Sequence, residues 1–444
     1  MLVLAVALAS YVRLGEDVWT QLADTPGLLR VLLIVVVCQV CLHYADLYDL
    51  RTITDTRDLL VRLFQALGAT SLILAVVYFW FPEWVIGRGV FLLSALLVIS
   101  LILTWRLMFG WMTRHVAPRE RLLLVGTNPA SVELARELFE RRQELGVEIV
   151  GFVDPDPERV GTHVLNPGVV GTIDDIPSLV PRLSVDRVVV SLSEARGRLP
   201  MDRLLDMRLQ NGVMFDHLAS VYEEYTGKIA VENLRPSWLI FSDGFRKTRA
   251  SMAAKRAFDI SLSLLGLIVG LPVMVLVAIA VRLTSRGPVF YHQDRVGLNG
   301  RIFMVHKFRT MRQDAEAATG PVWSRPNDVR ITTVGRFLRR TRLDELPQLW
   351  NVLRGDMSFV GPRPERPEFV KDLTEKIPFY GQRHVVKPGL TGWAQVRYTY
   401  GASVEDAIEK LQYDLYYIKN LTFSLDIVIV LDTIKTVVLR RGAQ

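Results

Sequence analysis

The sequence predicts a three-part chain: membrane-spanning α-helices, then an α/β domain built on a parallel sheet, then a region that begins with one more long apolar helix. Three observations support this division. Apolar stretches dominate residues 1–113, short apolar strands alternate with helical stretches over residues 114–245, and residues 250–444 combine an apolar run with dense clusters of arginine, glycine and proline. Strands that alternate with helices are typical of parallel sheets.

The composition excludes several classes of protein. Of the 444 residues 50% are hydrophobic and only 22% are charged, which argues against disorder and against a purely soluble enzyme. The 53 Lys and Arg residues outnumber the 46 Asp and Glu residues, giving a net charge of +7. This basic excess favours an anionic partner, such as a membrane surface, a nucleotide or a lipid phosphate.

The two cysteines are too few for a disulfide framework. Cys38 and Cys41 are spaced as in redox or zinc motifs, but they lie inside an apolar stretch, and no further cysteine completes a metal site. We therefore expect them to pack between membrane helices.

Four apolar stretches are candidate membrane spans: residues 1–12, 31–44, 63–81 and 90–112. A bilayer core needs about 20 apolar residues, so the last two suffice and the second does if it extends over Leu28 and Tyr48. The first is short. It is either a clipped span or a signal peptide cleaved after Ala7-Leu8-Ala9, although no Lys or Arg precedes it.

Basic residues predict the orientation of these spans. They gather between the second and third spans and after the fourth, whereas the loop between the third and fourth has only Arg88. The basic residues in question are Arg51, Arg57, Arg62, Arg114, Arg119 and Arg121. Because cytoplasmic loops are enriched in Lys and Arg, the chain after residue 113 is expected to begin in the cytoplasm.

The second part has strand patterns at residues 122–125, 148–153, 187–192 and 212–218. A dinucleotide-binding turn after the first strand would need glycines at positions 126, 128 and 131, and only Gly126 is present. Asp154, at the end of the second strand, is a candidate ribose ligand. An NAD-type cofactor is thus one interpretation, and a regulatory or structural Rossmann-like cytoplasmic module is the favoured one.

The apolar run at residues 260–281 is long enough to cross a membrane, but it contains Pro272 near its centre and is basic on both flanks. Proline removes a helical hydrogen bond and kinks the helix. A bent, re-entrant helix over residues 257–282, with both ends in the cytoplasm, therefore fits better than the alternative of a simple span.

Candidate chemistry centres on two adjacent carboxylates, Asp344 and Glu345, which stand before Pro347. Acidic residues at a helix start are stabilised by the helix dipole without any catalytic role, so the pair alone leaves both interpretations open. Neighbouring arginines favour the catalytic one, because guanidinium groups bind phosphate oxygens bidentately. A carboxylate can accept a phosphoryl group and its neighbour can hold a divalent ion. Residues 361–364 are expected to form a stiff loop that presents Arg363, and an ordinary Pro-Gly turn with an exposed arginine is the alternative.

Five ordered motifs from residue 250 onward resemble the catalytic domain of the bacterial sugar transferases, the monotopic phosphoglycosyl transferases that begin exopolysaccharide, capsule or O-antigen repeat units. The motifs are Lys255-Arg256-Ala257-Phe258-Asp259, Lys307-Phe308-Arg309-Thr310-Met311, Leu343-Asp344-Glu345-Leu346-Pro347-Gln348, Gly361-Pro362-Arg363-Pro364 and Pro388-Gly389-Leu390-Thr391-Gly392-Trp393. The layout with four spans and a Rossmann-like domain is similar to the large subgroup typified by undecaprenyl-phosphate glucose or galactose phosphotransferases. Arg342 departs from the pattern, because many relatives have a small polar residue there.

The resemblance implies an α+β monotopic catalytic domain and a two-step reaction. Asp344 would attack the β-phosphate of a UDP-sugar, most simply UDP-glucose or UDP-galactose, releasing UMP. Polyprenyl phosphate would then take up the covalent phosphosugar. Glu345 is implied as a ligand of Mg²⁺. The residues implied to bind phosphate or substrate are Lys307, Arg309, Arg339, Arg363, Arg383 and Asp414.

The expected location is the bacterial inner membrane, with several spans and the catalytic domain facing the cytoplasm. Expected partners are the UDP-sugar, the polyprenyl lipid, the membrane, a second copy in a homodimer and the downstream glycosyltransferases, but no nucleic acid. We also expect residues 423–441 to form an amphipathic helix on the membrane, an ordinary packing helix being the alternative. Catalysis is expected to survive removal of residues 1 to about 240, since the phosphate-handling motifs lie beyond Ala250.

Two other classes of protein stay open at this point. One is a non-enzymatic membrane scaffold whose Rossmann-like domain senses a nucleotide and controls an exporter, and the clustered arginine, proline and carboxylate motifs speak against it. The other is an NAD-dependent sugar epimerase or dehydratase fused to a membrane anchor. The missing glycines, and the lack of a Tyr-x-x-x-Lys pair in the Rossmann-like domain, disfavour it.

Overall fold

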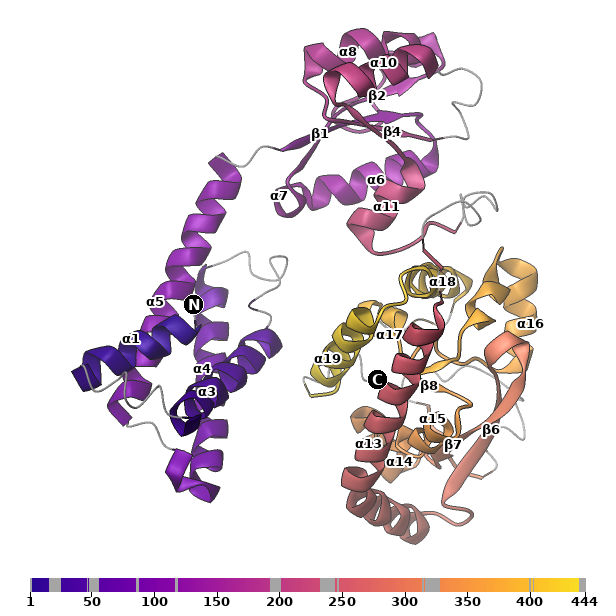
Figure 1. Ribbon diagram of the computed structural model, residues 1–444. Coiled ribbons are helices and arrows are strands. Elements are labelled where there is room, and N and C mark those ends of the chain that lie inside the picture. Colours follow the sequence, from indigo (N-terminus) through magenta and orange to yellow (C-terminus); the bar gives the residue numbers. More distant parts are fainter. Residues whose placement is uncertain are drawn as a thin grey trace.

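The computed structural model of the chain has three groups of elements, shown in Figure 1. It describes residues 2–15, 25–45, 47, 56–84, 88–115, 119–191, 201–231, 244–245, 247–313, 315, 328–398, 401 and 403–438. The basic residue Arg51 and the end of the predicted strand at Leu192 lie outside the described residues.

Among the described residues of the amino-terminal group, the α-helices are α1 (Leu2–Leu14), α3 (Thr25–Tyr44), α4 (Thr56–Trp80) and α5 (Arg88–His115). The stretches Gly27–Tyr44 and Leu59–Trp80 are long and apolar enough to cross a membrane, while Leu2–Arg13 and Leu92–Trp105 are shorter apolar helices. The side chain of Arg13, at the end of α1, lies against Gly89 at the start of α5. The end of α1 therefore lies beside the start of α5, as expected for the first and last of four spans that alternate in direction.

Cys38 and Cys41 are buried in the apolar cluster between these helices. Their neighbours in this cluster include Ala5 of α1, Leu42 of α3 and Leu63 of α4. The predicted packing of the two thiols between helices is thus confirmed, while the crossing of the membrane by these helices stays a prediction.

The second group is a five-stranded parallel sheet with the strand order β3-β2-β1-β4-β5. Its strands are β1 (Glu120–Val125), β2 (Val147–Asp154), β3 (Val169–Thr172), β4 (Arg187–Val190) and β5 (Met214–His217). The Rossmann-like order confirms the predicted α/β domain. The four-residue strand β3 was missed, because so short a stretch carries little hydrophobic periodicity.

Helices cover both faces of this sheet (Figure 1). One layer contains α6 (Pro129–Glu140) and α11 (Leu218–Thr226), whose Leu134 and Val221 pack on Leu124 of β1. The opposite layer contains α8 (Ile176–Leu183) and α10 (Met201–Asn211), which pack on alternate residues such as Leu123. This is the doubly wound arrangement that alternating strands and helices produce.

The third group is an α+β domain that starts with α13 (Arg249–Thr284). Its strands form an antiparallel hairpin, β6 (Phe290–Val296) with β7 (Ile302–Phe308), and a parallel pair, β8 (Ser358–Val360) with β9 (Gly389–Thr391). The remaining helices are α14 (Thr333–Thr341), α15 (Gln348–Arg354), α16 (Pro367–Lys376), α17 (Trp393–Arg397), α18 (Val404–Lys419) and α19 (Phe423–Val438).

The helix α13 is continuous through Pro272 and changes direction along its length (Figure 1). Its first half packs on α15, where Gly266 meets Leu349, and its second half packs through Val277 and Val281 on β7 and α14. Both halves thus contact the same domain, while apolar side chains near the middle face outward. These exposed residues include Leu264, Leu265, Ile268, Val269, Leu271, Val275 and Leu276. The re-entrant course over residues 257–282 stays a prediction that this packing supports.

The carboxy-terminal helix α19 is amphipathic, as predicted, but its polar side faces the protein rather than water. Asp426 is fully buried and pairs with Lys255 of α13 at 2.7 Å. The opposite side exposes apolar residues, among them Ile427, Leu431 and Ile434. A helix held inward by its charges and apolar on its outer face is suited to lie on a membrane.

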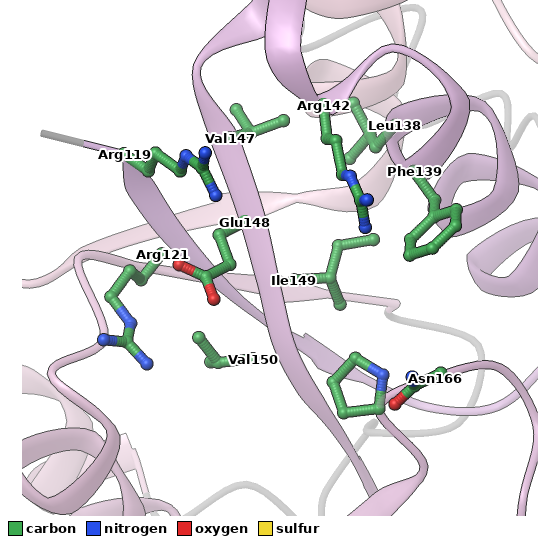
Figure 2. Close-up of a pocket in the computed structure, with 11 residues that line it drawn as sticks. Arg119, Arg121, Leu138, Phe139, Arg142, Val147, Glu148, Ile149, Val150 and Asn166 are labelled. Atoms are coloured by element: carbon green, nitrogen blue, oxygen red, sulfur yellow. The ribbon is translucent and has the colours of Figure 1, made fainter. Parts of the chain in front are cut away.

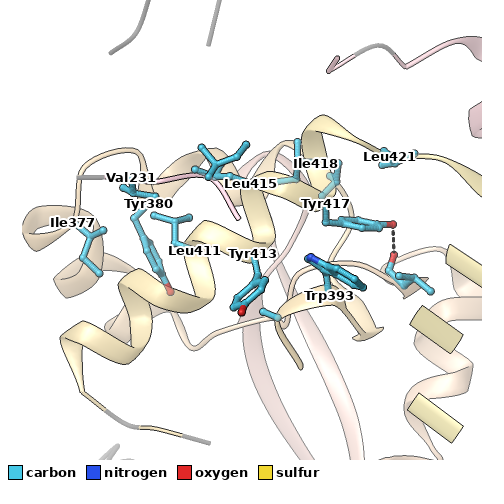
Figure 3. Packing of buried hydrophobic residues seen from close by; sticks show 14 of the residues in the cluster. Val231, Ile377, Tyr380, Trp393, Leu411, Tyr413, Leu415, Tyr417, Ile418 and Leu421 are labelled. Atoms are coloured by element: carbon cyan, nitrogen blue, oxygen red, sulfur yellow. Dashed lines mark hydrogen bonds between the residues drawn. The ribbon is translucent and has the colours of Figure 1, made fainter. Parts of the chain in front are cut away.

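The core of the third domain extends back beyond the predicted boundary at residue 250. Ile229 and Val231 are almost completely buried in the same cluster as Tyr380, Leu411 and Leu415 (Figure 3). Contacts between the second and third domains reinforce this junction, since Glu223 pairs with Lys419, and the indole N–H of Trp393 donates to the Gly227 carbonyl at 3.0 Å. A cut at about residue 240 would therefore remove part of the core.

Candidate active site

The adjacent carboxylates Asp344 and Glu345 lie in a single 3₁₀ turn between α14 and α15. The turn forms because Arg342 adopts a left-handed conformation, with a φ of 57°, and so ends α14 abruptly. Both carboxylates are buried, with exposures of 8% and 9%. Such a short connection between two packed helices gives the pair little freedom to move.

Three cationic side chains converge on Glu345 from different elements. Its Oε1 atom lies 3.1 Å from Lys307 Nζ of β7, 3.0 Å from Arg363 Nη2 of the loop after β8, and 3.9 Å from Arg342 Nη1. Burial raises the pKa of Glu345, but these cations outweigh it and hold the pKa below its usual range. Glu345 is thus a fixed anion that gathers cations around the turn.

Asp344 has the opposite environment. Its Oδ1 atom is buried and finds no hydrogen-bond partner in the part of the chain that the structure describes. Burial, followed by the negative charge of Glu345, raises the pKa of Asp344, although Lys307, Arg339 and Arg342 partly oppose the rise. A desolvated carboxylate with an unused oxygen, close to cations, is what a nucleophile for phosphoryl transfer needs.

Arg339 lies on the last turn of α14, within electrostatic reach of Asp344. Its Nε donates to the Thr310 hydroxyl at 2.9 Å, which ties the guanidinium to the segment after β7. Lys307, Arg339 and Arg363, all predicted to bind phosphate, are therefore brought to the same turn.

Arg383 and Asp414 lie behind this cluster rather than in it. They form a fully buried ion pair at 2.7 Å, and Arg383 also donates to the Arg363 carbonyl at 3.0 Å and to the Tyr380 hydroxyl at 2.6 Å. Burial raises the pKa of Asp414 to about 6, although Arg383 opposes the rise. This geometry favours a positioning role for both residues, because their charges satisfy each other and hold the loop that carries Arg363.

Tight backbone packing also holds the loop that carries Arg363. A Cβ atom on Gly361 would lie 2.4 Å from the Lys387 carbonyl oxygen, and one on Gly389 would lie 2.1 Å from the Gly361 nitrogen. Only glycine fits at such distances. The motifs at residues 361–364 and 388–393 are thus two sides of one backbone contact.

Arg309, also predicted to bind phosphate, has a different environment. Its guanidinium donates to the Ser285 carbonyl at 2.9 Å, to the Ser285 hydroxyl at 2.7 Å and to the Arg286 carbonyl at 2.6 Å. These bonds satisfy groups just beyond the end of α13. The geometry favours a role in anchoring the apolar helix rather than contact with a phosphate.

Sequence reasoning assigned no role to the polar residues that join α13 to the site. Lys255 donates to the Val360 carbonyl at 3.0 Å as well as pairing with Asp426, and Asp259 accepts from the Phe359 backbone at 2.9 Å. The sequence did carry a signal for these contacts: Lys255 and Asp259 are four residues apart at the start of an apolar helix. Charged residues buried at such positions need partners elsewhere in the protein.

Asn351 was missed in the same way. This fully buried side chain accepts from the His306 backbone at 3.1 Å and donates to the Met304 carbonyl at 2.7 Å. It therefore ties α15 to β7 beside Lys307. The sequence signal for this role was the presence of a polar residue, Asn351, within the apolar stretch after Pro347.

The predicted Mg²⁺ ligand is Glu345, and the charges around it do not favour a resident ion. Its Oε1 atom is already shared by Lys307 and Arg363. Within the described ranges, no group of three or more His, Cys, Asp or Glu residues is placed to hold a metal ion. The donor set does not fit a resident Mg²⁺ ion, and no step below depends on one.

In the Rossmann-like domain, the turn after β1 is closed by its own side chains. The Thr127 hydroxyl donates to Asp154, and Arg159 donates to Thr127 at 2.7 Å. Asn128 caps α6 by accepting from the Ser131 backbone at 2.8 Å. The candidate ribose ligand Asp154 is thus engaged with Thr127 and Arg159 within the protein. A regulatory or structural role of this module stays a prediction.

A pocket of about 340 Å³ lies at the opposite, amino-terminal edge of this sheet. Figure 2 shows Arg119, Arg121 and Glu148 on one side of β2 and Arg142 on the other, where its guanidinium lies 4.5 Å from the centre of the Phe139 ring. The pocket is far along the strands from the turn where a dinucleotide would bind.

Taken together, the fold and the site define a membrane-associated enzyme with a buried pair of carboxylates in a cationic cluster. Comparisons with known proteins agree with this class. Residues 250–440 match the family model described as bacterial sugar transferase, and residues 43–205 match a model described as CoA-binding domain. The chain belongs to the bacterial sugar transferase family.

Several curated relatives are similar over large parts of the chain. A UDP-N-acetylgalactosamine-undecaprenyl-phosphate N-acetylgalactosaminephosphotransferase of Aeromonas hydrophila is 40% identical over 51% of this chain and 53% of its own length. An undecaprenyl-phosphate glucose phosphotransferase of Komagataeibacter xylinus is 34% identical over 81% of this chain and 66% of its own length. A UDP-glucose:undecaprenyl-phosphate glucose-1-phosphate transferase of Xanthomonas campestris pv. campestris is 32% identical over 80% of this chain and 72% of its own length. The match to the first relative thus spans about half of that protein.

Proposed function

We propose that this protein transfers a sugar phosphate from a UDP-sugar to polyprenyl phosphate through a covalent intermediate on Asp344. The observation that carries the proposal is the buried Asp344 carboxylate, whose Oδ1 atom has no partner among the described residues while cations surround the adjacent Glu345. Relatives named as undecaprenyl-phosphate sugar phosphotransferases support it.

In the first step, Asp344 attacks the β-phosphorus of the UDP-sugar. A bond forms between a carboxylate oxygen and phosphorus, the phosphoanhydride bond breaks, and UMP leaves with the electron pair. In the second step, an oxygen of polyprenyl phosphate attacks the same phosphorus and the carboxylate of Asp344 is released. Lys307, Arg339 and Arg363 stabilise the negative charge of the phosphates in both steps.

The membrane supplies the second substrate, and the exposed apolar residues of α13 and α19 are suited to place the site at its surface. A re-entrant α13 keeps Asp344 on the side of soluble UDP-sugars. We therefore propose that the catalytic domain faces the cytoplasm at the inner membrane. Release of the lipid product there would supply downstream glycosyltransferases.

A direct assay tests the proposal and identifies the sugar that is transferred. Purified protein in detergent or nanodiscs is incubated with polyprenyl phosphate and a panel of UDP-glucose, UDP-galactose and UDP-N-acetylgalactosamine, and UMP release is measured. We expect UMP with at least one donor and none with Asp344→Asn. Folded, membrane-inserted protein that releases no UMP from any donor in the panel would contradict the proposal.

A further inference from the structure

Gln348, the first residue of α15, has an unused hydrogen-bond donor beside the two carboxylates. The side chain is 4% exposed, and its Nε2 atom has no hydrogen-bond partner within the described residues. A buried N–H group that has lost its water and gained no acceptor destabilises the folded protein. We therefore expect this N–H group to donate a hydrogen bond to an acceptor on the bound substrate.

The backbone places Gln348 on the same side as Asp344. Leu346 and Pro347 both have right-handed helical dihedral angles, with φ and ψ of −52° and −39° and of −62° and −19°, so the helical path continues from the 3₁₀ turn into α15. Residues four apart on such a path lie on the same face. We therefore expect the donor of Gln348 and the oxygen of Asp344, both without partners among the described residues, to lie on the same side of this path.

A buried donor and a buried acceptor on the same face, both without partners among the described residues, are suited to bind a third group. We propose that Gln348 Nε2 donates a hydrogen bond to a non-bridging oxygen of the phosphoryl group that Asp344 attacks, which makes Gln348 a catalytic residue. The inference rests on the proposed function. Gln348 forms no covalent bond and moves no proton: it stabilises charge that develops on the phosphoryl oxygen as the new bond to Asp344 forms.

Replacement by a residue of the same length tests this role. Gln348→Met keeps the volume and removes the donor, and Gln348→Glu keeps the shape but places a carboxylate oxygen where the donor was. Loss of one such donor lowers kcat by about 10²–10³-fold in enzymes of comparable design. We expect this fall in kcat for Gln348→Met, a larger fall for Gln348→Glu, and little change in the KM for the UDP-sugar.

Gln412 of α18 supplies the matched control, since it is also buried, at 7% exposure, but belongs to a different element. Gln412→Met is expected to change kcat by less than about threefold, because Gln412 lies on α18, outside the turn that carries the two carboxylates. A structural effect of losing a buried amide would appear in both variants. The rate at which the phosphosugar adduct forms on the protein, followed by mass spectrometry without polyprenyl phosphate, should fall in parallel with kcat for the Gln348 variants alone.

Two outcomes separate this inference from the proposed function. Wild-type protein that forms no adduct and releases no UMP refutes both. Wild-type protein that turns over while Gln348→Met retains kcat within about threefold, or while Gln348→Met and Gln412→Met lose the same amount, refutes only the role of Gln348. If Gln348→Met fails to insert or fold, Gln348→Glu provides the same comparison.

Discussion

Replacing the proposed nucleophile is expected to abolish turnover and, at the same time, to stabilise the catalytic domain. Asp344 is buried, its Oδ1 atom is unpartnered among the residues described, and burial raises its pKa. The ionised side chain is therefore less stable in the folded protein than in water. Asp344→Asn removes this charge and keeps the shape.

The expected gain follows from the direction of the pKa shift. Each unit by which a carboxyl pKa rises on folding corresponds to about 1.4 kcal/mol of lost stability once the group is ionised. The pKa of Asp344 rises to about 6, roughly two units above its usual value even though Lys307 and Arg339 oppose the effect of burial, so we expect Asp344→Asn to gain up to about 3 kcal/mol, or up to about 6–12 °C in the thermal midpoint of a domain of this size.

The gain should depend on pH with a defined sign. A carboxyl group whose pKa is raised on folding destabilises the protein above its folded-state pKa and has no effect below its unfolded-state value. The difference between Asp344→Asn and wild type should therefore be full at pH 8 and should shrink as the pH falls through 5 towards 4. Scanning fluorimetry of both proteins in the same detergent measures it.

Asp372→Asn is a matched control, because Asp372 is half exposed and pairs only with the equally exposed Lys376 on its own helix. It should lower stability by less than about 1 kcal/mol. An Asp344→Asn protein that melts below wild type at pH 8, or that shows the same difference at every pH, would refute the view of Asp344 as a destabilised buried anion.

Three further predictions follow from the packing. Asp414→Ala leaves Arg383 charged and buried, so it should destabilise the domain by about 3–5 kcal/mol, and pairing it with Arg383→Met should restore much of that loss on thermal unfolding. A chain that begins at Leu218 should fold and release UMP. A chain that begins at residue 241 should have a lower thermal midpoint, because its core lacks Ile229 and Val231. Equal thermal midpoints for the two chains would contradict the extended core. In a background without native cysteines, Ser251→Cys and Arg286→Cys should both be shielded from an impermeant thiol reagent in intact cells, and labelling of Arg286→Cys alone would show a true span.

The features that the sequence predicts correctly are those set by interactions between residues close together in the chain. Local periodicity was enough for the four amino-terminal helices and for the parallel sheet, and the adjacency of Asp344 and Glu345 marked the centre of the site. Lys307 and Arg363 could be placed near that centre only through the resemblance to a family, because they come from elements 38 and 18 residues away from Glu345.

The remaining parts depend on contacts that no local pattern carries. In the sequence, nothing separates Arg309 and Arg383 from Arg339 and Arg363, the arginines that we propose to bind phosphate. In the structure, Arg309 anchors the end of α13 and Arg383 pairs with Asp414. Ile229 lies beside the junction of two domains, and only the packed structure shows which core it joins. Arginine roles and domain boundaries are set by tertiary packing, which hydrophobic periodicity does not encode.

The central claim is that Asp344 becomes covalently linked to a sugar phosphate, and peptide mass spectrometry tests it most directly. Protein incubated with a donor identified by the UMP assay, in the absence of polyprenyl phosphate, should carry the mass of the phosphosugar on the peptide that contains Asp344. Adding polyprenyl phosphate should remove the adduct, and Asp344→Asn should never acquire it. UMP release without any adduct on that peptide, or an adduct on another residue, would contradict the account.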